Sequence, residues 1–140
     1  MNSLSIFAPF FAMIALTIVV WFYMYARRIP FIIRSKLTPM QLSPVEFARL
    51  SPPAIANPSD NLKNLFELPT VFYALVLCLY VTNHVDATYI GAAWLFVGFR
   101  VLHSAVHCTF NFVPLRFWLY AGGAISLWFM VVRATLALTW

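Results

Sequence analysis

The stretch Lys63–Val81, KNLFELPTVFYALVLCLYV, joins a polar start to a long apolar run. From Pro69 onward it contains no charged residue and suits lipid, whereas Asn64 and Glu67 stand at its start, three residues apart. Residues at positions i and i+3 of a helix share one face. The stretch therefore predicts a membrane helix that opens with a polar face.

The composition of the whole chain agrees with a membrane location. Of its 140 residues, 63% are hydrophobic and only 9% are charged. A soluble globular domain carries about 25% charged residues, because polar groups must cover much of its surface. We therefore expect an integral membrane protein, and the length predicts a single domain over residues 1–140.

Four apolar segments match the length of a membrane-spanning helix, which needs about 20 residues. They cover about residues 4–25, 65–82, 89–110 and 115–138. The connections between the last three are short, so these helices are expected to be antiparallel neighbours. The sequence thus predicts an all-α membrane protein built as an antiparallel four-helix bundle.

The long connection, residues 27–60, separates the first two spans. It contains six prolines, which argue against a long helix because each proline lacks a backbone donor and restricts its neighbours. Within it, SPVEFARL (Ser43–Leu50) could form one short interfacial turn with Phe47 and Leu50 toward lipid.

Basic residues set the expected orientation. Residues 27–60 carry five of the nine lysines and arginines, whereas the connection between the second and third spans has none. Basic loops stay in the cytoplasm, so both termini are expected outside. The net charge of +5 then follows from topology and requires no nucleic-acid partner. Cys78 and Cys108 fall toward opposite ends of their helices, so no disulfide is predicted between them.

Polar residues inside the third span also follow helical spacing. Arg100, His103 and His107 occupy positions i, i+3 and i+7 of one stripe. Arg100 lies roughly 15 Å from the inner end of this span, close to mid-bilayer. An unpaired guanidinium there costs at least about 2.5 kcal/mol, and Glu67 is the one acidic residue within a span. We therefore predict an ion pair between Glu67 and Arg100.

The polar cluster has two interpretations. With Arg116 at the start of the fourth span, it would form a cytoplasm-facing site for an anionic ligand. Alternatively, its members would only hold the helices together, as buried polar groups in membrane bundles often do. His103 and His107 have a spacing that can chelate a metal, but their helix offers no third ligand, so no metal site is predicted.

These residues resemble motifs of the MAPEG superfamily, the membrane-associated proteins of eicosanoid and glutathione metabolism. NLFELP (Asn64–Pro69) is similar to the family's Asn-x-x-Glu followed by proline in helix 2. RVLHSAVH (Arg100–His107) is similar to the Arg-x-x-His-x-x-x-Tyr motif of the prostaglandin E synthase branch. Arg116 stands nine residues further on, where that branch has the arginine that activates the thiol.

The resemblance implies a homotrimer with three sites between neighbouring subunits. It implies a transferase or peroxidase that uses glutathione as co-substrate, with Arg116 stabilising the thiolate. A lipophilic electrophile or hydroperoxide would reach the sulfur from the surrounding membrane lipid. The residues expected to bind glutathione are Lys63, Asn64, Glu67, His103, His107 and Arg28.

Two positions depart from the family pattern. Asp60 stands where the glutathione-using branches place an arginine, and His107 replaces the helix 3 tyrosine. The superfamily also contains a non-catalytic member that binds lipid and serves a partner enzyme. The alternative function is therefore a lipid-binding or scaffold trimer whose polar cluster is structural.

A third hypothesis is a proton or ion carrier that uses Glu67, His103 and His107. The single acid within the spans and the absence of a broken-helix repeat in the sequence disfavour it. The compact length and the lack of a C-terminal retention signal lead us to expect a bacterial inner membrane.

Overall fold

The structure of the chain, a computed structural model, describes residues 3–139 and is helical over nearly all of them. A 3₁₀ turn, η1 (Ser3–Ile6), leads into α1 (Phe7–Arg34), and a second, η2 (Pro39–Leu42), follows it. The remaining elements are α2 (Pro44–Leu50), α3 (Pro53–Asn64), α4 (Leu68–Val81), α5 (Ala87–Cys108) and α6 (Val113–Thr139).

Four helical segments are long and apolar enough to cross a membrane, as the sequence predicts. They are Leu4–Arg34, Pro53–Val81, Ala87–Cys108 and Val113–Leu138. The second segment comprises α3 and α4 in series. Large apolar side chains lie exposed on the outside of these helices, among them Trp94, Trp118 and Ile125. Such a surface is stable when lipid rather than water surrounds it.

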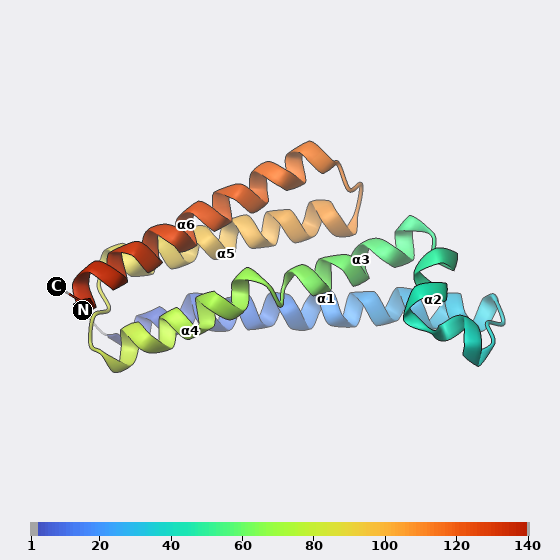
Figure 1. Cartoon of the computed structure of the whole chain (residues 1–140), viewed down its shortest axis with the longest axis horizontal. Helices are drawn as coiled ribbons and strands as arrows, with labels where there is room; N and C mark the ends of the chain where they lie inside the picture. The colour runs from blue at the N-terminus through green and yellow to red at the C-terminus, as the bar shows by residue number, and fades with distance from the viewer. Residues whose placement is uncertain (1–2, 140) are drawn as a thin grey trace.

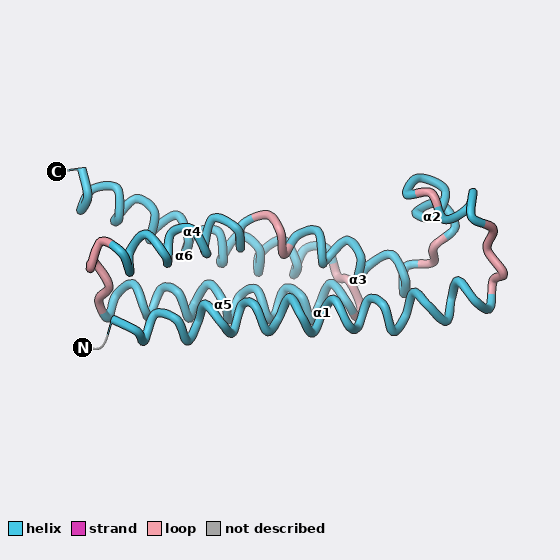
Figure 2. The backbone as a smooth tube through the Cα atoms, turned by 90° about the horizontal axis from the view of Figure 1, so that it is seen from below, coloured by secondary structure: helices cyan, strands magenta, loops and turns pink. Residues whose placement is uncertain are grey.

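The helices form two antiparallel pairs (Figure 1). In one pair α5 lies along α6, and in the other α1 lies along α3 and α4. Figure 2, turned by 90°, shows α1 close to α5, which joins the two pairs. Residues near both termini lie at one end of the bundle, whereas α2 lies at the opposite end.

The apolar core fills the half of the bundle nearer the termini. Phe72 of α4 stacks on Phe96 of α5 with 4.7 Å between the ring centroids, and neither side chain is exposed. Met13 of α1 and Met130 of α6 are also fully buried in this cluster. The polar residues described below lie beyond it, toward the end that carries α2.

A salt bridge holds the end of the α5–α6 pair that lies near the termini. Asp86 caps α5, because its Oδ1 accepts a hydrogen bond of 3.0 Å from the backbone N–H of Tyr89. Arg133 of α6 donates to both carboxylate oxygens, with 2.8 Å between Nη1 and Oδ1. This hydrogen bonding from Arg133 lowers the pKa of Asp86 to about 2.

The expectation that the prolines keep residues 27–60 from forming a long helix is wrong in part. The first helix continues through Pro30 to Arg34, and α3 forms twelve residues that include Pro58. Pro53 opens α3, where a missing N–H costs nothing because no intrahelical acceptor exists there. Ile55 and Pro58 are buried where α3 packs against its neighbours, and this packing offsets the backbone bond that Pro58 cannot make.

The short helix expected within Ser43–Leu50 is present as α2, but the expected position of Phe47 is wrong. Phe47 is only 6% exposed, because its ring packs against Phe31 and beneath the guanidinium of Arg28, 4.2 Å from the ring centroid. Contacts with α1 thus bury the aromatic face of α2, while Leu50 is 37% exposed.

The second span is interrupted at Leu65–Glu67, where the chain leaves helical geometry. Pro69 explains the break, since a proline ring clashes with the carbonyl of the residue four positions before it, here Leu65. Glu67 becomes the residue before α4 with φ −92° and ψ −103°. Asn64 and Glu67 therefore do not share a face of one helix: Asn64 ends α3, and Glu67 is the last residue of the break.

Candidate functional site

The break in the second span opens onto a cavity of about 240 Å³. Asn64 and Glu67 line it from the break, and His103 lines it from α5. The remaining wall comes from the first two turns of α6, with Val113, Arg116, Phe117 and Tyr120. The structure thus brings together four of the residues that the sequence nominates: Asn64, Glu67, His103 and Arg116.

The predicted ion pair between Glu67 and Arg100 is not formed. Arg100 is fully buried, and its Nη2 donates a hydrogen bond of 2.6 Å to the backbone carbonyl of Asn64. Within residues 3–139 no salt bridge joins the two side chains, and Glu67 is exposed.

The helix break explains why Arg100 has a backbone partner. The carbonyl of Asn64 lies at the C-terminus of α3, where the carbonyls lack regular helical donors. The negative end of the helix dipole points the same way and favours a cation there. The C-terminus of α3 thus binds Arg100 in place of the predicted Glu67 carboxylate.

Several buried polar atoms around Arg100 have no hydrogen-bond partner among the described residues. They are Nε and Nη1 of Arg100, Nε2 of His103 and Nδ1 of His107. Buried polar atoms are nearly always paired in native structures, because leaving one unpaired costs about 1–3 kcal/mol. The inner face of α5 therefore offers donors and acceptors to a further polar group.

His103 connects α5 to the start of α6. Its Nδ1 lies 3.0 Å from the backbone oxygen of Arg116, which requires the proton to be on Nδ1. Its ring also packs against Tyr120, with 5.8 Å between the centroids. The guanidinium carbon of Arg100 lies 5.4 Å from the centroid of Tyr120, a distance that allows a cation–π interaction.

The side chain of Arg116 is held by the turn between α5 and α6. Its Nη1 donates a hydrogen bond of 2.7 Å to Oδ1 of Asn111. Asn111 in turn donates from Nδ2 to Oδ1 of Asn57 in α3, at 3.0 Å. Asn111 has φ +48°, a left-handed conformation that asparagine tolerates better than most residues. The orientation of Arg116 thus depends on α3 through two amide side chains.

Sequence reasoning missed Tyr120, Asn111 and Asn57. Tyr120 had a usable signal, because it follows Arg116 by four residues and so lies on the same face of a helix. Asn111 and Asn57 had no comparable signal, since their hydrogen bond joins residues 54 positions apart.

Arg28 and Lys63 do not line this cavity. Both line a separate pocket of about 320 Å³ that also contains Asp60. Lys63 is paired with Asp60 at 2.9 Å, and Arg28 lies over the ring of Phe47. Lys63 and Arg28, which the family resemblance assigns to glutathione binding, therefore line a different pocket of the same chain from the one that contains Arg116.

His107 lies buried beside His103, with the ring centroids 5.5 Å apart, but does not line the cavity. Across residues 3–139 no group of three His, Cys, Asp or Glu side chains is placed to hold a metal ion. Cys78 and Cys108 are free thiols, and Cys108 accepts a hydrogen bond from Nδ2 of the buried Asn61, with 3.4 Å between nitrogen and sulfur.

Comparison with known proteins gives one family. The family model described as MAPEG family matches residues 6–136, nearly the whole chain. No curated protein and no solved structure matches the chain significantly.

Proposed function

Because the chain belongs to the MAPEG family and is an integral, multi-pass membrane protein, we propose that it is a glutathione-dependent transferase or peroxidase acting on lipophilic electrophiles. The observation that carries this proposal is the cavity in which Asn64, Glu67, His103 and Arg116 meet. It combines a fixed cation with an amide, a carboxylate and an imidazole, which suit the charges and amides of a tripeptide.

Arg116 is the residue that we assign to catalysis. A guanidinium beside a thiol favours the charged sulfur and lowers the pKa of the thiol, and the thiolate is the attacking nucleophile. In the transferase reaction the thiol proton goes to solvent, and the sulfur then forms a bond to the electrophilic carbon. The leaving group departs from that carbon with its electron pair. Asn111 holds the Arg116 guanidinium in place for this role.

Asn64, Glu67 and His103 are assigned to binding. The Asn64 side chain can bond a peptide group of glutathione, and the exposed Glu67 carboxylate can bind its amino group. The unpaired Nε2 of His103 is available as an acceptor when Nδ1 carries the proton. His107 is also assigned to binding from the sequence. Because it is buried against the ring of His103, it would support that ring instead of contacting glutathione itself.

We further propose that the functional unit is a homotrimer with its termini outside. A cavity of about 240 Å³ in one chain is smaller than the roughly 300–1,000 Å³ of ordinary ligand pockets, so a neighbouring subunit would complete it. Lys63 and Arg28, which line a different pocket of the same chain, would reach glutathione only across such an interface.

The second candidate function is a non-catalytic lipid-binding or scaffold trimer. The ion pair between Asp60 and Lys63 favours it, because this pair neutralises a cation that would otherwise bind a glutathione carboxylate. Thermal stabilisation in detergent separates the two functions. A ligand at 100 times its Kd should add about 2.7 kcal/mol of stability, whereas a scaffold protein gains nothing from glutathione.

A further inference from the structure

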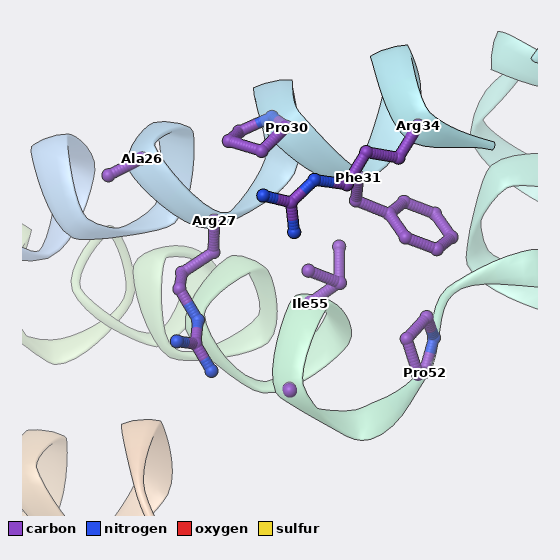
Figure 3. Close-up of a pocket in the computed structure, with 8 residues that line it drawn as sticks. Ala26, Arg27, Pro30, Phe31, Arg34, Pro52 and Ile55 are labelled. Carbon is purple, nitrogen blue, oxygen red and sulfur yellow. The ribbon is translucent and has the colours of Figure 1, made fainter. Parts of the chain in front are cut away.

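A third pocket with basic residues in its wall lies between the last turns of α1 and the start of α3. Its volume is about 370 Å³, and its walls include Arg27, Phe31 and Arg34 of α1 and Ile55 of α3. Arg27 and Arg34 are seven residues apart and so share one face of α1. In Figure 3 both side chains extend from α1 on the side of α3, and the side chain of Arg34 runs back along α1 toward Arg27.

Neither arginine of this pocket is neutralised. No acidic side chain lines the pocket, and within the described part of the chain neither Arg27 nor Arg34 forms a salt bridge. The pocket of Lys63, by contrast, contains Asp60, and the cavity of Arg116 contains Glu67. Two unopposed guanidinium groups facing one space favour a phosphate group, whose oxygens match the donors of arginine.

The depth of the pocket matches the headgroup layer of a bilayer. Trp21, Tyr23 and Tyr25 precede it on α1, and such aromatic residues gather at membrane interfaces. Arg27 follows Tyr25 by two residues, or about 3 Å of helix. The headgroup layer extends about 5–7 Å beyond the hydrocarbon on each side, so Arg27 stands within it. Arg34 lies about 10 Å further along α1, and its side chain extends back toward Arg27 and so toward this layer (Figure 3).

An apolar pocket adjoins the basic pocket on its membrane side. It has a volume of about 300 Å³ and lies between α1 and α5, with Val19, Tyr23 and Val101 among its lining residues. Tyr23 connects the two pockets, because the guanidinium carbon of Arg27 lies 5.7 Å from the centroid of its ring. A phosphate-binding space thus lies directly beside a space for hydrocarbon.

From this juxtaposition we propose that the chain binds an anionic phospholipid of the surrounding leaflet. Arg27 and Arg34 bind the phosphate of the headgroup, and the apolar pocket between α1 and α5 holds part of an acyl chain. The lipid fixes the cytoplasmic extension of α1 against α3, the segment that leads to the break at Leu65–Glu67. This site is separate from the cavity of Arg116 and does not depend on the proposed catalytic activity.

The experiment titrates the protein in uncharged detergent with phosphatidylglycerol or phosphatidylcholine and counts bound lipid by native mass spectrometry. Arg27→Gln with Arg34→Gln should weaken phosphatidylglycerol binding about thirtyfold, since each arginine contributes about 1 kcal/mol at an anionic surface and 1.4 kcal/mol is tenfold in affinity. The matched control, Lys36→Gln with Arg49→Gln, removes the same charge from exposed residues outside both pockets and should change affinity less than about twofold. Size-exclusion chromatography in the same detergent checks that both double variants are folded and assembled, since each should elute at the same volume as the wild type.

Two further arms identify the ligand. Glycerophosphoglycerol, the headgroup without acyl chains, should bind far more weakly than the lipid, and added glutathione should leave lipid binding unchanged. The proposal would be overturned if both double variants lost the same affinity for phosphatidylglycerol. It would also be overturned if the wild type bound phosphatidylcholine as tightly as phosphatidylglycerol, or bound the free headgroup as tightly as the lipid. Displacement of the lipid by glutathione would also overturn it and would assign this pocket to the co-substrate.

Discussion

The side-chain oxygen of Asn111 accepts a hydrogen bond of 2.7 Å from Nη1 of Arg116. Asn111 belongs to the turn between α5 and α6, and its own amide is anchored to Asn57 of α3 at 3.0 Å. The guanidinium assigned to thiolate stabilisation is therefore positioned by a residue outside the cavity. Its backbone is held as well, by His103 of α5.

Replacing Asn111 by glycine tests this positioning. Glycine keeps the left-handed backbone but removes the acceptor, so the guanidinium loses its fixed orientation. We expect kcat to fall about tenfold, corresponding to roughly 1.4 kcal/mol, and the pH–rate profile to move to higher pH because the thiolate is less stabilised. The control is Asn83→Gly, since Asn83 also has positive φ but lies at the far end of the bundle. If Asn111→Gly and Asn83→Gly have the same kcat and the same pH–rate profile, Asn111 does not position Arg116.

Substitutions at the helix break separate side-chain from backbone roles. Arg100 bonds the carbonyl of Asn64, so Asn64→Ala should leave stability within about 0.5 kcal/mol while glutathione affinity falls. Glu67→Gln should behave likewise, because Glu67 is exposed and forms no salt bridge among residues 3–139. Arg100→Gln should cost about 1.5–3 kcal/mol, the range for a hydrogen bond to a charged group. Thermal unfolding in detergent measures the stability, and a glutathione titration measures the affinity. A large loss of stability in Glu67→Gln would indicate that Glu67 and Arg100 form an ion pair after all.

How much the sequence predicts depends on the range of the interaction. Hydropathy is a local property, so the four spans and the polar stripe of α5 are predictable. The helix break at Leu65–Glu67 is also a local effect of Pro69, yet the apolar run hides it, and its consequence is that Arg100 meets a carbonyl rather than Glu67. The burial of Phe47 and the link from Asn57 to Asn111 depend on long-range packing, for which one sequence gives no spacing rule.

The salt bridge between Asp86 and Arg133 gives stability a defined pH dependence. The pKa of Asp86 is lowered to about 2 in the folded protein, below its value of about 3.9 in an unfolded chain. Its contribution is therefore complete above about pH 5 and is lost as the pH falls through the folded pKa, from about pH 5 to about pH 1. Because both side chains are partly exposed, we expect at most about 1 kcal/mol. The difference in melting temperature between wild type and Asp86→Asn should be constant above pH 5, shrink as the pH falls and vanish near pH 1. A difference that stays constant from pH 5 to pH 2 would contradict this pH dependence.

Close packing of α5 on α6 predicts unequal effects at two glycines. A Cβ atom at Gly122 would lie 2.7 Å from Cε1 of Phe99, whereas a Cβ atom at Gly91 would meet nothing within 4 Å. Gly122→Val should therefore destabilise the protein by about 1–3 kcal/mol through overpacking, and Gly91→Val should not. Adding Phe99→Ala should restore most of the stability lost in Gly122→Val. Thermal unfolding of the four proteins measures this, and equal melting temperatures for the two glycine variants would contradict the packing described.

Our claim that Arg116 stabilises a glutathione thiolate in the cavity at the helix break is tested by the ultraviolet absorbance of the bound thiolate. We expect thiolate absorbance at neutral pH when glutathione is added to wild-type protein, retained in part by Arg116→Lys and lost in Arg116→Ala. Undiminished thiolate absorbance in Arg116→Ala, or no glutathione binding to the wild type, would contradict the claim.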